Sequence, residues 1–193
     1  MEPLQVLQRV ISGLEALGIH YMLAGSFVSS LHGRARFTQD ADLIVDFPPS
    51  QLDAFEQAFA SDFYVDRGLI EQALKRGTSF NIIHFESSFK VDFFVLSGQD
   101  FDREEFSRRV LRQLDPRSEF EAYVQTPEDA VLSKLDWYRR GGRISENQWR
   151  DVLGMLRQQA GRLDLVYLRQ WAGELGLVDL LDRACQDAGI EAL

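Results

Sequence analysis

Two short apolar segments of the chain carry carboxylates where a buried strand should have none. The segment "DADLIVDF" begins with Asp40 and Asp42, and "FKVDFFVL", residues 89–96, places Asp92 among aromatic and aliphatic side chains. Their alternation and their content of Val, Ile and Phe predict two strands. Side chains two residues apart on a strand share a face, so Asp40 and Asp42 lie about 6.5 Å apart on one face. The chain must therefore build a sheet with an acidic pair on one face.

This acidic pair needs a neutralising partner. Two unit charges at that distance repel by roughly 2.5 kcal/mol at an effective dielectric near 20, which a fold has no reason to accept. Mg²⁺ is typically held by one or two carboxylates together with substrate phosphates. If the strand of Asp92 neighbours the strand of Asp40 and Asp42, the three acids converge. Such a set suits the two-metal chemistry of phosphoryl or nucleotidyl transfer.

A Gly-Ser turn precedes the acidic strand. The segment "HYMLAG" predicts a short strand that runs into Gly25, and residues 26–33 predict a helix that starts at the turn. Gly25 lets the backbone approach a phosphate closely, and amides at a helix start together with the Ser26 hydroxyl point at an anion. Arg34 and Arg36 follow in a loop, where they either bind substrate or are simply solvated.

The remaining pattern predicts an α+β fold. Helices are expected at residues 4–17, 50–60 and 100–114, and residues 79–86 and 89–96 predict a hairpin. From Thr126, which can cap "PEDAVLSKLDWYRR", the pattern is helical only. We therefore expect a core of mixed β-sheet with flanking helices over residues 1–125, and a helical C-terminal region, residues 126–193, packed on it.

Charge is unevenly distributed along the chain. The net charge is −9, which argues against nonspecific coating of nucleic acid. Residues 40–66 hold seven acids and no Lys or Arg, whereas residues 130–162 hold seven bases and three acids. One region is suited to cations and the other to anions. No apolar run approaches the roughly 18 residues of a membrane span, so we expect a cytoplasmic protein without membrane association.

The single cysteine, Cys185, can form no internal disulfide and no thiolate zinc site. The three histidines likewise lack the spacing of metal ligands. Candidate metal ligands are therefore carboxylates.

Residues 22–46 resemble the core motif of the nucleotidyltransferase superfamily with the polymerase-beta-like fold: a hydrophobic run, Gly-Ser, and Asp-x-Asp after a gap of thirteen residues. The form R-x-T-x-D-x-D, at Arg36, Thr38, Asp40 and Asp42, is similar to the AbiEii/MenT branch, the nucleotidyltransferase toxins of type IV toxin-antitoxin systems and abortive infection. "KVD", "KLDWYRR" and "WRDVLGML" resemble the later motifs of that branch. The likeness covers about residues 20–157.

The resemblance implies a metal-dependent enzyme that moves a nucleoside monophosphate from an NTP to an acceptor and releases pyrophosphate. It implies Asp40, Asp42 and Asp92 as ligands of Mg²⁺ or Mn²⁺ and, with Lys134, as the catalytic set. The nucleotide would be bound by Gly25, Ser26, Lys134 and Arg139. Asp151 either belongs to the fourth motif or orders Arg139 or Lys134. For Lys134, a solvated lysine on a helix flank is the alternative interpretation.

The acceptor remains open. The toxin resemblance implies tRNA or another RNA, bound along residues 134–162, and an antitoxin protein as partner. A small cationic acceptor such as an aminoglycoside would suit the acidic run instead. A non-catalytic member of the fold that binds nucleotide or a partner chain is a further alternative, whereas a glycosyltransferase with Asp-x-Asp would need a larger domain.

Overall fold

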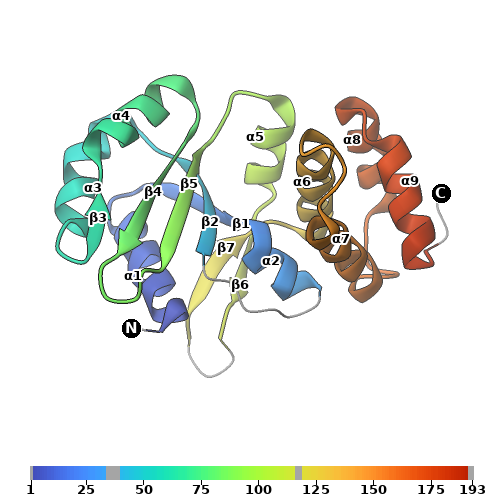
Figure 1. The fold of residues 1–193 in the computed structure, drawn as a ribbon, viewed down its shortest axis with the longest axis horizontal. Coiled ribbons are helices and arrows are strands. Elements are labelled where there is room, and N and C mark those ends of the chain that lie inside the picture. Colours follow the sequence, from blue (N-terminus) through green and yellow to red (C-terminus); the bar gives the residue numbers. More distant parts are fainter. Residues whose placement is uncertain (1, 34–39, 116–118, 191–193) are drawn as a thin grey trace. The chain divides into compact units, whose positions relative to one another are not determined.

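The computed structural model describes residues 2–33, 40–115 and 119–190, and it shows a mixed sheet in the N-terminal part followed by helices (Figure 1). The α+β prediction is confirmed. The elements are α1 (Pro3–Ala16), β1 (His20–Ala24), α2 (Gly25–His32), β2 (Asp40–Asp46), the 3₁₀ turn η1 (Pro49–Gln51), α3 (Leu52–Phe59), β3 (Phe63–Val65), α4 (Arg67–Arg76), β4 (Ser79–His84), β5 (Lys90–Val95), α5 (Asp100–Ser107), β6 (Val110–Gln113), β7 (Glu121–Val124), α6 (Pro127–Arg140), α7 (Glu146–Gln158), α8 (Leu165–Leu175) and α9 (Val178–Ala188).

The described strands form one sheet of seven, in the order β3-β4-β5-β2-β1-β7-β6. The pairs β2/β5 and β1/β7 are parallel, and the other neighbours are antiparallel. The two strands that carry the acids, β2 and β5, are therefore direct neighbours near the middle of the sheet. This neighbourhood is the condition under which the three carboxylates share a site.

The described residues divide into two compact units. The first comprises Met1–Ala24 and Thr38–Val124, and the second comprises Gly25–Phe37 and Gln125–Leu193. A division of the sequence at residue 125 does not anticipate that α2 groups with the C-terminal helices. The reason lies in the ring of the buried His32, whose Nε2 is 2.8 Å from the carbonyl oxygen of Gln125, while the Gln159 side chain donates to the His32 carbonyl at 2.9 Å.

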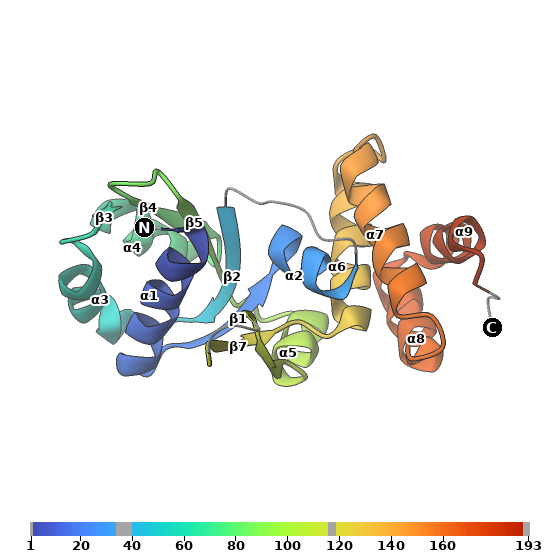
Figure 2. The same cartoon turned by 90° about the horizontal axis from the view of Figure 1, so that it is seen from below.

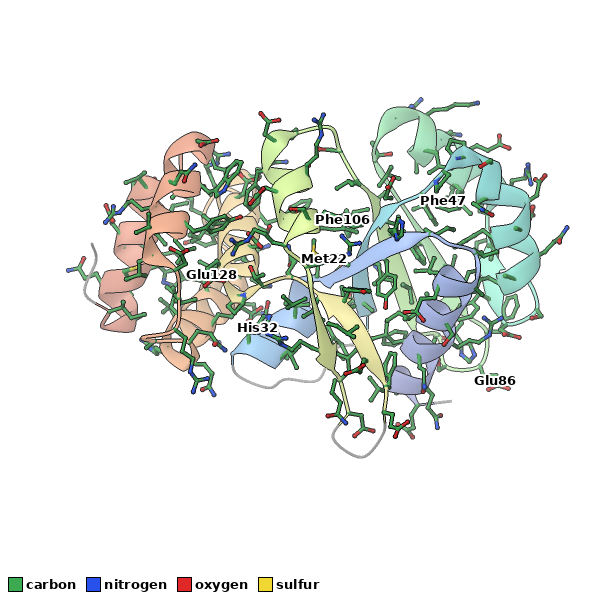
Figure 3. All side chains as sticks on the ribbon, turned by 180° about the vertical axis from the view of Figure 1, so that it is seen from behind. Met22, His32, Phe47, Glu86, Phe106 and Glu128 are labelled. Carbon is green, nitrogen blue, oxygen red and sulfur yellow. The ribbon has the colours of Figure 1, made fainter. Side chains whose placement is uncertain are left out.

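An aromatic layer fills one side of the sheet in the first unit. Phe80 on β4 and Phe93 on β5 are in register and stack with ring centroids 4.8 Å apart. Phe55 from α3 packs edge-on against Phe93 at 5.7 Å and lies 5.1 Å from Phe47, which Figure 3 labels after β2. Helix α1 adds its buried stripe beside α3 (Figure 2), formed by Val6, Leu7, Val10, Ile11 and Leu14. Side chains of opposite strand parity, including the acids, thus face the other way.

One predicted element is wrong. Residues 100–114 do not form a single helix, because α5 ends at Ser107 and residues 110–113 form the edge strand β6, which pairs antiparallel with β7. The sequence does not reveal this strand because arginines surround it: Arg108 and Arg109 precede it and Arg112 lies within it. An edge strand can expose charged side chains, so it lacks the alternation of apolar and polar residues that marks a half-buried strand. Strands β3 and β7 and helix α4 were also not predicted. Helix α4 nevertheless has ordinary signals, with Asp66 as its N-cap and Gly77 in the left-handed region at its end.

The predicted cap at Thr126 is confirmed, because its side chain accepts a hydrogen bond from the Asp129 amide at the start of α6. Ser145 caps α7 in the same way and accepts from the Gln148 amide. The fully buried Asp129 accepts hydrogen bonds from the hydroxyls of Thr126 and Tyr167, each at 2.6 Å, and so ties α8 to the start of α6. Within residues 2–33, 40–115 and 119–190, no helix combines the length and the apolar character that a membrane crossing requires.

Candidate active site

A row of four side chains crosses the sheet on the face that is opposite the aromatic layer. In the strand register, Ala24 of β1 is opposite Asp42 of β2, Asp42 is opposite Asp92 of β5, and Asp92 is opposite Asn81 of β4. Neighbouring strands lie about 4.8 Å apart, so the backbones of Asp42 and Asp92 are separated by one strand spacing. The predicted convergence of these two acids on one face is therefore present in the backbone.

A second row lies two residues away along the strands. Asp40 of β2 is opposite Lys90 of β5, which is opposite Ile83 of β4. On β2 and β5 the acidic positions and Lys90 are half-buried, whereas the intervening Ala41, Leu43, Val91 and Phe93 are buried on the aromatic side. Asp40, Asp42, Lys90 and Asp92 thus form one polar cluster, which we call the acidic face.

Lys90 is a member of the acidic face that sequence reasoning missed. Its Nζ lies 2.6 Å from Asp92 Oδ2, with exposed side-chain fractions of 41% for Lys90 and 18% for Asp92. The hydrogen bond to Asp92 raises the pKa of Lys90, and the charges of Asp92, Asp40 and Asp42 add to this shift. The signal was available, because in "KVD" the lysine precedes the aspartate by two residues and must share its face.

The acidic face has the donor type that Mg²⁺ prefers, since all three candidate ligands are carboxylates. As the side chains lie, however, no group of three or more His, Cys, Asp or Glu residues in the described parts of the chain is gathered closely enough to hold a metal ion. The contact with Lys90 occupies one oxygen of Asp92. In their chemistry, the carboxylate oxygens of Asp40, Asp42 and Asp92 fit a divalent cation.

The Gly-Ser turn adopts the geometry that its sequence indicates. Gly25 has φ 65°, in the left-handed region that favours glycine, and it starts α2 directly after β1. The hydroxyls of Ser29 and Ser30 donate to the carbonyls of Gly25 and Ser26 at 2.7 and 3.0 Å, which holds the first turn of the helix. A phosphate-binding role for Gly25 and Ser26 stays a prediction.

Lys134 and Asp151 form an ion pair between α6 and α7. Lys134 Nζ lies 2.9 Å from Asp151 Oδ2, and the two side chains are only 12% and 13% exposed. Of the two interpretations of Asp151, this geometry supports the one in which it orders Lys134. Lys134 is not the solvated lysine of the alternative interpretation, and its contact with a nucleotide stays a prediction.

Arg139 has structural partners within the second unit. Its guanidinium donates to Asp136 Oδ1 at 2.6 Å and to the Leu175 carbonyl at 2.8 Å, near the end of α8. A nucleotide contact by Arg139 likewise stays a prediction. Arg34, Arg36 and Thr38 lie outside the described residues.

Most charges in the acidic and basic runs are matched locally. In the first unit, Arg67 contacts Asp53, Glu56 and Glu71 at 2.7, 2.9 and 3.1 Å, and Arg9 holds Asp62 at 3.0 Å. In the second unit the pairs are Arg140 with Asp136, Arg143 with Asp179 and Arg150 with Glu146. Ion pairs thus involve Asp53, Glu56 and Asp62 of the acidic run and most bases of the basic run, whereas the acidic face is the polar cluster built into the sheet itself.

No protein-family model matches the sequence, and neither does any curated protein. Among solved structures, an antigenic nucleotidyltransferase-like protein from Paracoccidioides brasiliensis matches with a TM-score of 0.56 at 17% identity, covering 96% of this chain and 92% of its own. This chain has a nucleotidyltransferase-like fold. The lincosamide antibiotic adenylyltransferase LnuA, lincomycin-bound, matches with a TM-score of 0.46 at 14% identity over 77% of this chain and 93% of its own.

A CCA-adding enzyme in complex with ATP matches this chain with a TM-score of 0.42 at 13% identity, over 88% of this chain and 47% of its own. These identities are low, and the likeness that carries weight is one of fold. None of the three structures is described as a toxin of the AbiEii/MenT branch, so that branch stays a prediction. Activity and acceptor must be argued from the acidic face.

Proposed function

We propose that this protein is a Mg²⁺-dependent nucleotidyltransferase that transfers a nucleoside monophosphate from an NTP to an acceptor and releases pyrophosphate. The observation that carries the proposal is the register of Asp42 with Asp92 on the parallel strands β2 and β5, with Asp40 two residues before Asp42 on the same face. Three carboxylates on one face repel one another, and a bound divalent cation would offset this repulsion. The nucleotidyltransferase-like fold supports the same reaction.

The acidic face would hold the metal through Asp40, Asp42 and Asp92. Mg²⁺, or Mn²⁺ in its place, supplies charge neutralisation of the triphosphate and a lowered pKa of the acceptor hydroxyl. Ala24, the β1 neighbour of Asp42, carries only a methyl group, so it offers the Asp42 carboxylate no competing polar partner. Asp92 is the acid that would activate the acceptor or hold a second metal.

The turn after β1 would bind the triphosphate. Gly25 follows Ala24 directly in the chain, and its left-handed backbone lets α2 begin at once. Backbone amides at the start of α2 and the Ser26 hydroxyl are donors of the kind that suits phosphate oxygens. Lys134, oriented by Asp151, and Arg139 complete the proposed nucleotide contacts.

RNA is the acceptor that the toxin resemblance favours, tRNA first, with an antitoxin protein as the accompanying partner. The arginines of the second unit would supply phosphate contacts, since Arg140 and Arg150 are 58% and 72% exposed and their surface ion pairs are weak. Because these arginines must exchange acidic partners for phosphates, RNA binding should weaken steeply with salt.

A small cationic acceptor, of the aminoglycoside type, is the second candidate. The net charge of −9 and the carboxylates of the acidic face favour a cation over a polyanion. A third candidate function is that of a binding module, which would bind NTP without transferring its nucleoside monophosphate.

Transfer of label from each α-labelled NTP in the presence of Mg²⁺ tests the function. The acceptors are total tRNA and, separately, a panel of aminoglycosides. Asp42→Asn is compared with Asp46→Asn, a matched control because Asp46 is exposed on the same strand and face. We expect label on one acceptor class, lost in Asp42→Asn and kept in Asp46→Asn. Label that persists in Asp42→Asn would refute the proposed site, and NTP binding without transfer to either class would favour the binding module.

A further inference from the structure

Lys90 is a cation built into a cluster of carboxylates. It contacts Asp92 at 2.6 Å and is opposite Asp40 in the strand register, two residues along the strands from the row that holds Asp42. A surface lysine without a role would extend into solvent, because its ammonium is strongly hydrated. Here the ammonium is turned toward the acidic face instead.

The electrostatics explain why Lys90 takes this position. Three like charges within one or two strand spacings destabilise the fold unless a positive charge offsets them. The Lys90 ammonium lies 2.6 Å from Asp92 and opposite Asp40 in the strand register, so its positive charge is placed among the three carboxylates. Lys90 thus supplies, in the metal-free protein, part of the neutralisation that a divalent cation would supply.

The two partners differ in their freedom to move. Lys90 is 41% exposed and ends a flexible stem, whereas Asp92 is 18% exposed on a central strand. When a competing cation approaches Asp92, the ammonium can therefore withdraw into solvent while the carboxylate stays on the acidic face.

We propose that Lys90 is a resident counter-cation that holds Asp92 in the metal-free protein and is displaced when a divalent cation binds, so that Lys90 lowers the metal affinity of the acidic face. This inference rests on the proposed function, since it takes Asp92 as a metal ligand. It adds a residue that tunes metal binding without being a ligand itself.

Mn²⁺ binding to the 193-residue chain, measured by electron paramagnetic resonance without nucleotide, tests the proposal. Lys90→Gln removes the competing charge, and Lys75→Gln is a matched control because it removes the same charge from an exposed position on α4. Since a partly exposed ion pair is weak and the two cations also repel, we expect Lys90→Gln to bind Mn²⁺ about three- to tenfold more tightly. Lys75→Gln should change affinity by less than about twofold, because a distant surface charge is screened.

A second variant separates charge from geometry. Lys90→Arg keeps the positive charge, so its Mn²⁺ affinity should stay near that of the wild type. Circular dichroism checks that each variant is folded, and the rise in melting temperature on adding Mn²⁺ should be larger for Lys90→Gln than for the wild type. Unchanged or weaker Mn²⁺ binding by Lys90→Gln would overturn the proposal.

The same Mn²⁺ assay tests the proposed metal site separately from the role of Lys90. If Asp42→Asn binds Mn²⁺ as tightly as the wild type does, the acidic face is not the metal site, whatever Lys90→Gln does. If Asp42→Asn loses binding and Lys90→Gln gains none, the metal site stands and only the role of Lys90 is refuted.

Discussion

The ion pair between Lys134 and Asp151 predicts a measurable coupling in stability. Both side chains are nearly buried, at 12% and 13% exposure, and their charged atoms are 2.9 Å apart. Removing one partner breaks the ion pair and leaves the other charge largely desolvated, which typically costs about 3–5 kcal/mol. Because a little solvent reaches this pair, we expect Asp151→Leu and Lys134→Met each to lower the free energy of unfolding by about 3 kcal/mol.

The double substitution Lys134→Met with Asp151→Leu should cost much less than the sum. It removes both charges and fills the space with apolar atoms, a change that is often close to neutral. We therefore expect a loss of about 1 kcal/mol and a coupling free energy of several kcal/mol. Urea unfolding followed by far-UV circular dichroism at one ionic strength measures all four proteins. A double variant whose loss equals the sum of the single losses would refute the coupling.

The same proteins separate structure from function at Lys134. If Lys134 only holds α6 to α7, the double variant should recover both stability and nucleotidyl transfer. If Lys134 also contacts the triphosphate, as the family resemblance implies, the double variant should be stable and yet show a raised KM for NTP. Asp151→Leu alone provides the reference for an unpaired lysine.

Three further predictions concern single positions. Gly33→Ala should lower the free energy of unfolding by about 1–3 kcal/mol, measured by urea unfolding. An added Cβ would lie 2.9 Å from the Met155 amide nitrogen and from the Ser29 carbonyl oxygen, and these backbone atoms cannot move aside. An unchanged urea midpoint would contradict this prediction. Gly25→Ala should lower the free energy of unfolding by about 1 kcal/mol through the positive φ of the turn, whereas Ser26→Ala should not. Burial raises the pKa of the Cys185 thiol, so its reaction with a disulfide reagent should be slow at pH 8 and should accelerate on unfolding in urea; rapid labelling of the native protein would be the contrary result.

Much of the acidic face could be predicted because strands follow a simple period. The alternation in "DADLIVDF" fixes Asp40 and Asp42 on one face, and the same period fixes Lys90 beside Asp92. The strand order was beyond sequence reasoning, since the parallel pairing of β2 with β5 is a long-range property that no local pattern encodes. The contact between Lys90 and Asp92 is not evident from the sequence, because a metal ion would neutralise Asp92 equally well.

The errors in the fold fall where local signals are weak. The edge strand β6 is four residues long and rich in polar side chains, so it continues the charged pattern of α5 without a visible break. The grouping of α2 with the C-terminal helices depends on long-range contacts such as that of the His32 ring with the Gln125 carbonyl, 93 residues away in the chain. No periodicity within residues 25–32 reveals such a partner.

The most direct measurement is a crystal structure with Mn²⁺ and an NTP analogue that cannot be cleaved between its α- and β-phosphates. We predict an anomalous Mn²⁺ peak coordinated by Asp40 and Asp42, with Asp92 released from Lys90 and the triphosphate at the turn of Gly25. Mn²⁺ bound elsewhere, with the Lys90 contact to Asp92 intact beside a bound nucleotide, would contradict the assignment of the acidic face as the catalytic site.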